Sequence, residues 1–216
     1  MSEAMNQEEY DWYKENYIFN LDKHDLNNPE PAEQFVIDIL EKKRNGHYVE
    51  LGAFHSRIAS NTYHLEKDYD WKGVSLEIVP VLHQEMVRNR KNECVLGDAT
   101  TFNYTKYFEE NNFPKQIDFL QVDIDSGYDN SARPNGNPNL SLLGLIALPL
   151  NTYRFSVITF EHDMFTNFKL QPMRDAAREI LYSLGYTLVV RKKHEDWWVD
   201  PNVVPYKKYI NYFQEQ

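Results

Sequence analysis

Two stretches of the chain decide the predicted fold: Tyr48-Val49-Glu50-Leu51-Gly52-Ala53 and Ile117-Asp118-Phe119-Leu120-Gln121-Val122-Asp123-Ile124-Asp125. Both are short, mostly apolar runs that end in small or acidic residues, which is typical of strands buried in a parallel sheet. The glycine after the first strand would let the backbone approach a ligand closely. Because ligands of open α/β sheets bind beyond the carboxyl ends of the strands, functional residues are expected where each strand ends.

Strands and helices alternate on both sides of these stretches. The expected strands cover residues 47–53, 73–78, 93–96, 117–125, 155–160, 186–191 and 197–199, and the expected helices cover residues 31–44, 60–67, 80–89, 104–111, 140–148 and 172–184. The alternation predicts βαβ units with right-handed crossovers and a mostly parallel α/β sheet. The last two strands have no helix between them, so they must pair antiparallel.

The chain length of 216 residues suits a single α/β domain. Residues 1–30 are polar and acidic and end in a turn rich in Asn and Pro, so they are interpreted as an N-terminal arm with one short helix near residues 8–17. Residues 31–216 form the predicted domain. The sequence shows neither a secretory signal nor an apolar run of membrane-spanning length, which favours the cytoplasm.

The charge balance indicates which classes of partner the protein is expected to bind. Acidic residues outnumber basic ones by 33 to 23, which gives a net charge of -10. A field of that sign repels phosphate backbones and anionic lipids, so neither nucleic acid nor a membrane is expected as a partner. Cys94 is the single cysteine, which excludes an intramolecular disulfide and a multi-cysteine metal site. The C-terminal aromatic residues, among them Trp197 and Trp198, are expected to pack in the core, with a homodimer surface as the alternative.

The ends of the second and third expected strands carry residues suited to an adenosine ligand. Glu77 follows Gly52 by about 20 residues, a spacing at which a carboxylate usually holds ribose hydroxyls. Ile78, the next residue, could cover an adenine face. Asp98 follows Gly97 and could accept a hydrogen bond from a purine amine, or could instead cap the next turn. The plainer interpretations are a solvated Glu77 and a turn at Gly52 that binds nothing.

Acidic residues gather at the ends of the fourth and fifth expected strands. Asp123 and Asp125 share one side of the extended chain, and like charges held close are unfavourable unless a cation, a hydroxyl or a proton lies between them. Glu161, His162 and Asp163 follow the fifth strand. Asp123, Glu161 and Asp163 could bind a hard divalent cation such as Mg²⁺, or His162 could act as a general base. The alternative is a set of solvated or capping side chains.

The order of these motifs resembles the FkbM family of S-adenosylmethionine-dependent methyltransferases. The resemblance extends over most of the chain, from residue 45 to residue 201. It is carried by the two stretches quoted above, by Ser60-Asn61-Thr62-Tyr63-His64-Leu65-Glu66-Lys67, Trp71-Lys72-Gly73-Val74-Ser75-Leu76-Glu77 and Gly97-Asp98-Ala99, and by Glu195-Asp196-Trp197-Trp198-Val199-Asp200-Pro201. It implies a Rossmann-like class I methyltransferase fold, in which a mostly parallel sheet of seven strands with an antiparallel C-terminal strand carries helices on both faces.

The resemblance also implies how S-adenosylmethionine would be held. Glu50 and Gly52 would line the methionine end, Glu77 would hold the ribose, Asp98 would reach the adenine, and Asp123 would lie beside the sulfonium and the acceptor. The residues assigned to the cofactor are Glu50, Gly52, Ala53, Asn61, Thr62, Glu77, Ile78, Asp98, Ala99 and Asp123. Some relatives of this fold also use Mg²⁺, with acids at the ends of the fourth and fifth strands.

The chain departs from the family pattern in two places. Phe54-His55-Ser56 follows Ala53 where the family shows a small polar residue and then Asp and Gly. Asp125-Ser126-Gly127 stands where the family continues into a Glu-Gly pair. Residues 128–139, which come next, are interpreted as a substrate lid, with a disordered surface loop as the alternative.

Together these features predict a methyltransferase that methylates an oxygen of a small acceptor, such as a hydroxyl of a sugar-like molecule or natural product. Such an enzyme must align the acceptor in line with the sulfonium and accept its proton. His162, Asp123 and Asp125 are the predicted catalytic residues. Three alternatives stay open: a metal-dependent glycosyltransferase that uses Asp123 and Asp125, a non-catalytic methyltransferase-like binding module, and a phosphoesterase acting at the acidic cluster.

Overall fold

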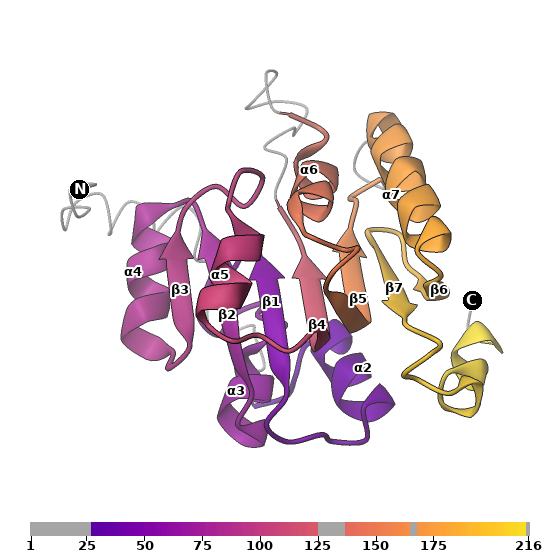
Figure 1. Cartoon of the computed structure of the whole chain (residues 1–216), viewed down its shortest axis with the longest axis horizontal. Coiled ribbons are helices and arrows are strands. Elements are labelled where there is room, and N and C mark those ends of the chain that lie inside the picture. Colours follow the sequence, from indigo (N-terminus) through magenta and orange to yellow (C-terminus); the bar gives the residue numbers. More distant parts are fainter. Residues whose placement is uncertain (1–26, 125–136, 165–167, 215–216) are drawn as a thin grey trace.

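The computed structural model describes residues 27–124, 137–164 and 168–214. All seven strands join one sheet in the order β3-β2-β1-β4-β5-β7-β6 (Figure 1). The strands are β1 (His47–Leu51), β2 (Lys72–Glu77), β3 (Glu93–Leu96), β4 (Gln116–Val122), β5 (Arg154–Glu161), β6 (Thr187–Arg191) and β7 (Glu195–Val199). Strands β1 to β5 pair in parallel, and β7 pairs antiparallel with both β5 and β6. The predicted mostly parallel sheet with antiparallel C-terminal pairing is therefore confirmed.

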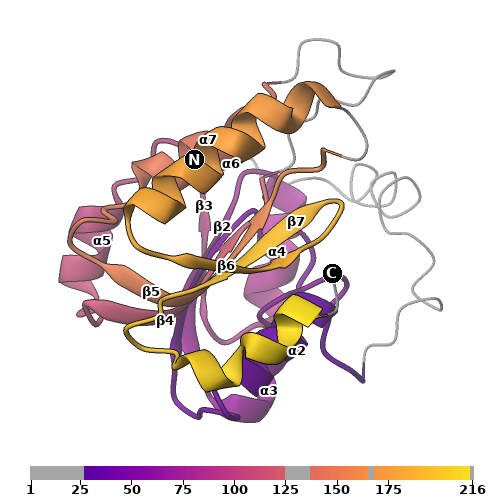
Figure 2. The ribbon, with the colours of Figure 1, turned by 90° about the vertical axis from the view of Figure 1, so that its right-hand side faces the viewer.

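Helices cover both faces of the sheet (Figure 2). The helices are α2 (Pro31–Ile39), α3 (Tyr63–Tyr69), α4 (Pro80–Asn89), α5 (Tyr104–Glu110), α6 (Leu140–Ala147) and α7 (Gln171–Ser183), with 3-10 turns η2 (Phe168–Leu170), η3 (Tyr206–Lys208) and η4 (Ile210–Gln214). We call the face covered by α5, α6 and α7 the α6 face, and the face covered by α2, α3, α4 and the C-terminal 3-10 turns the α2 face. The predicted N-terminal arm and its short helix lie mostly outside the described residues.

Most element boundaries match the predictions within two residues. The larger differences are the helix expected over residues 31–44, which ends at Ile39, the helix expected over residues 60–67, which begins at Tyr63, and the strand expected over residues 117–125, which ends at Val122. The helix expected over residues 31–44 ends at Ile39 because Glu41 and Lys42 adopt positive φ angles of 54° and 57°. The strand expected over residues 47–53 ends at Leu51 because the N–H groups of Gly52 and Ala53 both turn to the carbonyl of Leu76. Both corrections come from backbone geometry that the hydrophobic pattern does not encode.

The core of the α6 face is apolar. Phe108 of α5, Leu145 of α6 and Leu181 of α7 are fully buried against the strands. The α2 face has an apolar part built around Phe35, Val36 and Trp197.

No helix among the described residues has both the length and the apolar character needed to cross a bilayer.

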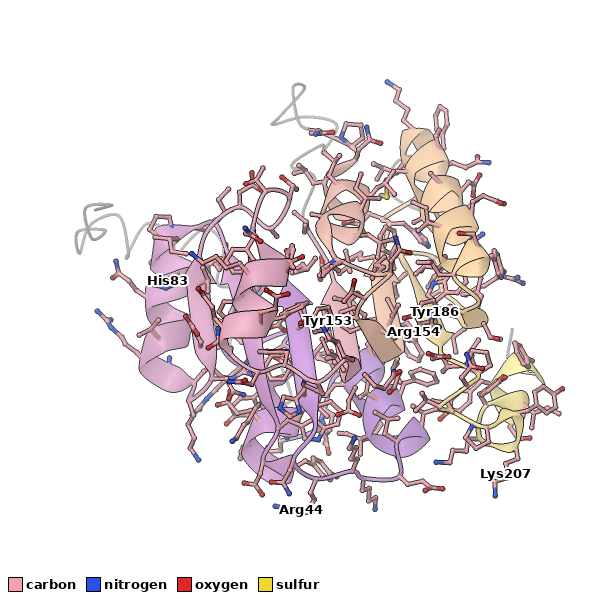
Figure 3. The ribbon with its side chains drawn as sticks, viewed as in Figure 1. Arg44, His83, Tyr153, Arg154, Tyr186 and Lys207 are labelled. Carbon is pink, nitrogen blue, oxygen red and sulfur yellow. The ribbon has the colours of Figure 1, made fainter. Side chains whose placement is uncertain are left out.

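The amino end of β5 carries a structural ion pair rather than a binding site. Nε of Arg154 donates to Oδ2 of Asp200 at 2.7 Å, and its Nη1 donates to the carbonyl of Leu184. The guanidinium lies over the ring of Tyr186, 4.6 Å from its centroid (Figure 3). These contacts tie the amino end of β5 to the end of α7 and to the residue after β7, whereas the predicted functional residues lie at the carboxyl ends of the strands.

Candidate functional site

The carboxyl ends of β1 and β4 meet where the strand order reverses. The N–H of Asp123 donates to the carbonyl of Leu51 at 2.9 Å, so the segments that continue β1 and β4 stay together beyond the last residue pair of the two strands. Gly52 has φ +81°, and a Cβ at this position would overlap the carbonyl oxygen of Asp123. Only glycine fits here, because it adopts left-handed backbone and has no side chain. The predicted glycine is therefore required by the fold at the point where open α/β sheets bind their ligands.

Glu77 ends β2 and ties two loops together. Its Oε2 accepts the N–H of Phe54 at 2.9 Å, and its Oε1 accepts the N–H of Val79 at 2.7 Å. Burial raises the pKa of this carboxyl, against the lowering effect of these hydrogen bonds. The next side chain, Ile78, is 64% exposed. An acid and an open apolar side chain thus lie at the end of β2 as predicted, and their contact with a ribose and an adenine stays a prediction.

Glu50 lies below the loop that follows β1 and is buried. One carboxylate oxygen accepts the hydroxyl of Thr62 at 2.9 Å, and the other accepts the hydroxyl of Ser75 at 2.5 Å. Burial raises its pKa and the guanidinium of Arg90 lowers it. Direct contact between Glu50 and a methionine tail would require this network to open. In this structure Glu50 and Thr62, both assigned to the cofactor from the sequence, support the loop from beneath.

The turn after β3 places Asp98 at the surface. Its Oδ1 accepts the N–H of Thr100 at 2.8 Å and the hydroxyl of Thr100 at 2.7 Å. This is the capping arrangement weighed as the alternative to adenine contact, and it uses one carboxylate oxygen for both bonds. Ala99 is buried, and its carbonyl accepts the hydroxyl of Tyr104.

A pocket lies at the carboxyl ends of β4 and β5, between α6 and α7. It is lined by Asp123, Ile124, Pro138, Ser141, Glu161, His162, Asp163, Leu170 and Met173. The acidic residues of this set were predicted to gather here. Burial raises the pKa of Glu161, and the nearby carboxylates of Asp123, Asp163 and Glu195 raise it further. Among the residues the structure describes, no three His, Cys, Asp or Glu side chains are arranged to hold a metal ion.

His162 is buried beside the pocket and is held from two sides. Its Nδ1 accepts the N–H of Met164 at 3.3 Å. Its Nε2 has no hydrogen-bond partner among the described residues and lies 3.8 Å from Oδ1 of Asp196. Because Nδ1 accepts a hydrogen bond, a neutral ring carries its proton on Nε2. A general-base role for His162 would need the contact with Met164 to break.

Arg178 holds the acid that faces His162. It donates to both carboxylate oxygens of Asp196, at 2.6 Å and 2.7 Å. Burial acts to raise the pKa of Asp196, but the hydrogen bonds and charge of Arg178, together with His162, hold that pKa below its usual value. Two other predictions have no counterpart here, because Asp125 and residues 128–136 of the predicted lid lie outside the described residues.

Sequence reasoning missed a buried polar network under the loop after β1. Arg90 donates to the carbonyls of Ser56 and Thr62, to the hydroxyls of Ser60 and Thr62, and to the hydroxyl of Tyr48. Glu85 accepts two bonds from Ser56. Both residues are in or next to α4 and are distant in sequence from the loop. No motif or spacing rule links them to it, so only the fold reveals the connection.

Comparisons with known proteins agree on the fold. No protein-family model matches the chain, and no curated protein does. Two solved structures resemble it: a candidate caffeoyl-CoA O-methyltransferase from Staphylococcus aureus (TM-score 0.53, 11% identity, 80% of this chain and 84% of that chain), and a candidate rRNA methylase from Clostridium thermocellum (TM-score 0.51, 7% identity, 79% and 96%). With the strand order above, they show that the chain has the Rossmann-like fold of class I S-adenosylmethionine-dependent methyltransferases.

Proposed function

We propose that the chain is an S-adenosylmethionine-dependent methyltransferase, related to the FkbM family, that methylates an oxygen of a small acceptor such as a sugar-like or natural-product hydroxyl. One observation carries the proposal: Glu77 and exposed Ile78 end β2 beside the Gly52 turn, in a sheet with the methyltransferase strand order. An acid in this place is suited to ribose hydroxyls. The net charge of -10 favours a small acceptor over nucleic acid.

The residues at the ends of β2 and β3 fit the adenosyl part of the cofactor. Oε2 of Glu77 accepts the N–H of Phe54 and Oε1 accepts the N–H of Val79, and a carboxylate oxygen can accept more than one hydrogen bond. Ile78 offers an open apolar surface to a purine ring. Asp98 is exposed and uses only Oδ1 for Thr100. When bound, the cofactor supplies an electrophilic methyl group on a sulfonium.

The acceptor is proposed to bind at the pocket between α6 and α7. Asp123 and Ser141 offer polar groups on one side, and Leu170 and Met173 form an apolar wall on the other. An acceptor with a hydroxyl and an apolar skeleton would satisfy both. The acidic lining disfavours anionic acceptors, because like charges repel in a pocket of low dielectric. Asp123 is the residue proposed to accept the hydrogen bond of the reacting hydroxyl, and the positions of the acids give no support for Mg²⁺.

Calorimetry with S-adenosylhomocysteine tests the proposal directly. The wild-type protein is expected to bind it, and Glu77→Ala is expected to bind it at least tenfold more weakly, since hydrogen bonds to a charged group contribute about 1.5–3 kcal/mol. Glu109→Ala, which changes an exposed acid on α5, serves as the matched control and should bind like wild type. Circular dichroism confirms that each variant is folded.

A thermal-shift panel separates the rival functions. S-adenosylmethionine and S-adenosylhomocysteine should raise the melting temperature, whereas UDP-sugars with Mn²⁺ should not. Stabilisation by a UDP-sugar alone would favour glycosyl transfer. If neither S-adenosylmethionine nor S-adenosylhomocysteine raises the melting temperature of the folded wild-type protein, the methyltransferase proposal is refuted.

A further inference from the structure

The loop between β1 and α3, residues 52–62, adopts a conformation that its sequence does not favour. Phe54 and Ala59 both have φ +53°, and left-handed backbone is uncommon for residues of these types. His55 and Ser56, which follow Phe54, are nonetheless buried. Such a backbone persists only where surrounding groups hold it in place. The groups that hold this loop therefore decide whether it keeps its shape.

Glu85 of α4 clamps the loop directly after its strained residue. Its Oε2 accepts the N–H of Ser56 at 2.8 Å, and its Oε1 accepts the hydroxyl of Ser56 at 2.7 Å. The same Oε1 lies 3.5 Å from Nε2 of His55. Nδ1 of His55 accepts N–H groups of the loop itself, so the neutral ring turns its remaining N–H toward Glu85. One carboxylate thus fixes two consecutive residues.

The clamp is linked to Glu77 through the backbone. Ser56 is two residues from Phe54, whose N–H donates to Oε2 of Glu77. Phe54 and Val79 also pack against the same small apolar cluster of Val81 and Leu82 in α4. If the loop moved, the carboxylate of Glu77 would lose the backbone donor of Phe54 and be held less firmly in its present orientation. Glu85 therefore acts on the end of β2 without touching it.

Glu85 differs from Arg90, the other group that holds this loop. Arg90 also bonds Glu66 and Tyr48, which belong to the body of the domain. Within the part of the chain that the structure describes, the hydrogen bonds and ion pairs of Glu85 reach the loop and Asn89 on its own helix. Removing Glu85 should loosen the loop while the sheet stays intact, which makes it a selective probe of the loop's role.

We propose that Glu85 is a positioning residue for the methyl donor: through Ser56 it holds the β1–α3 loop, and thereby Glu77, in the arrangement that binds the adenosyl group. This inference rests on the proposed function. It assigns to a carboxylate on α4 the task of fixing the loop in which Phe54-His55-Ser56 departs from the family's pattern. Glu85 itself is not proposed to contact the cofactor or the acceptor.

The test measures S-adenosylhomocysteine binding by calorimetry and loop protection by hydrogen exchange in the full chain. Glu85→Ala is expected to speed exchange in residues 53–62 and to weaken binding about tenfold, because it removes two hydrogen bonds to a charged group. Bound ligand should restore the protection. Glu85→Gln should weaken binding by about threefold, less than Glu85→Ala, because its amide oxygen can still accept from the Ser56 N–H while its NH2 group, which can only donate, replaces an oxygen that accepted hydrogen bonds. Glu109→Ala is the matched control and should change neither measurement.

The outcomes separate two failures. A folded wild-type protein that does not bind S-adenosylhomocysteine refutes the proposed function, and the inference falls with it. If the wild-type protein binds S-adenosylhomocysteine and Glu85→Ala binds it with equal affinity, the proposed role of Glu85 is overturned and the proposed function stands. Should Glu85→Ala fail to fold, Ser56→Ala serves instead, because it removes only the hydrogen bond of the Ser56 hydroxyl to Glu85. Binding weaker by about threefold, with faster exchange in the loop, would support the proposal. Unchanged binding would overturn it.

Discussion

The core of the α6 face and the part of the α2 face beneath the β1–α3 loop are buried by different means. On the α6 face, side chains such as Phe108, Leu145 and Leu181 exclude water by apolar contact. On the α2 face beneath the β1–α3 loop, Glu50 and Arg90 are buried instead. Apolar burial is non-directional, so it stabilises a face without fixing a particular loop conformation. The difference teaches that the face bearing the proposed cofactor loop depends on directional hydrogen bonds.

The polar network is stable only as a whole. Burial tends to lower the pKa of Arg90, but nearby Tyr48, Glu50 and Glu66 together raise it above its usual value. A buried charge that keeps its partners is tolerated, and one that loses them is costly. The α6 face should respond to mutation through lost volume, whereas the α2 face should respond through uncompensated charge. Four predictions test this contrast, ordered from the largest expected effect to the smallest.

The largest loss is expected from Arg90→Met. Methionine fills much of the volume but leaves Glu50 and Glu66 without their cation. Removing one partner of a buried ion pair costs about 3–5 kcal/mol. Urea unfolding at pH 8 should show a loss of about 4 kcal/mol in the free energy of unfolding.

The pH dependence of that loss identifies its cause. Burial already raises the pKa of Glu50, and without Arg90 it rises further. At pH 5 the carboxyl can therefore take up a proton in the folded variant, and the destabilisation should shrink. A loss of equal size at pH 5 and pH 8 would mean that Arg90 contributes by packing rather than by charge.

Leu181→Ala is the counterpart on the α6 face. Leu181 is fully buried in the apolar core. Truncating a buried leucine removes apolar contact and leaves a cavity, at a cost of about 3 kcal/mol. Urea unfolding should give the same loss at pH 5 and pH 8, because no ionisable group is involved. A strong pH dependence here would break the proposed contrast between the faces.

The sequence predicts the two faces unequally well. Hydrophobic periodicity locates α5, α6 and α7 of the α6 face within one residue of their observed bounds, because burying apolar side chains is what that pattern records. It does not reveal the Arg90 network, whose members are brought together by the fold from β1, β2, α4 and the loop before α3. The candidate site divides in the same way. Strand-end acids such as Glu77 can be found from their position in the sequence pattern. The hydrogen bonds by which Glu85 supports the β1–α3 loop cannot be found in this way.

A pH-dependent effect, smaller per pH unit than the two losses above, is expected at Glu33 of α2. Its Oε1 accepts the N–H of Leu65, and its Oε2 is buried without a partner among the described residues. Burial raises its pKa from 4.5 to about 8, against lowering by Leu65, His64 and Arg90. Because the folded-state value is the higher one, its contribution to stability is present at low pH and is lost as pH rises from about 4.5 to about 8.

Glu33→Gln should remove that dependence. Glutamine resembles the protonated acid, so the variant should become more stable relative to wild type with rising pH, by at most about 1.4 kcal/mol per pH unit. Urea unfolding at pH 5, 6, 7 and 8, values chosen to bracket the transition roughly, measures the difference. If the difference between the two proteins stays constant across that range, Glu33 is not protonated in the folded protein.

Two tyrosines provide the smallest and most direct comparison of the faces. On the α2 face, the hydroxyl of Tyr48 accepts from Arg90 at 3.2 Å and from Asn92 at 3.3 Å. On the α6 side, the hydroxyl of Tyr104 donates to the carbonyl of Ala99 at 2.7 Å. Both rings are almost fully buried, so Tyr→Phe removes one hydroxyl in either case and leaves the packing unchanged.

Tyr48→Phe should cost more than Tyr104→Phe, because the bond lost from Arg90 involves a buried charge. Hydrogen bonds to charged groups contribute about 1.5–3 kcal/mol and neutral ones about 1 kcal/mol. Since Arg90 keeps its other acceptors, the cost at Tyr48 should fall at the lower end of its range. Urea unfolding of both variants measures the difference. Equal losses would show that directional bonding to Arg90 adds nothing beyond an ordinary hydrogen bond, and the two faces would then differ in composition but not in how they resist unfolding.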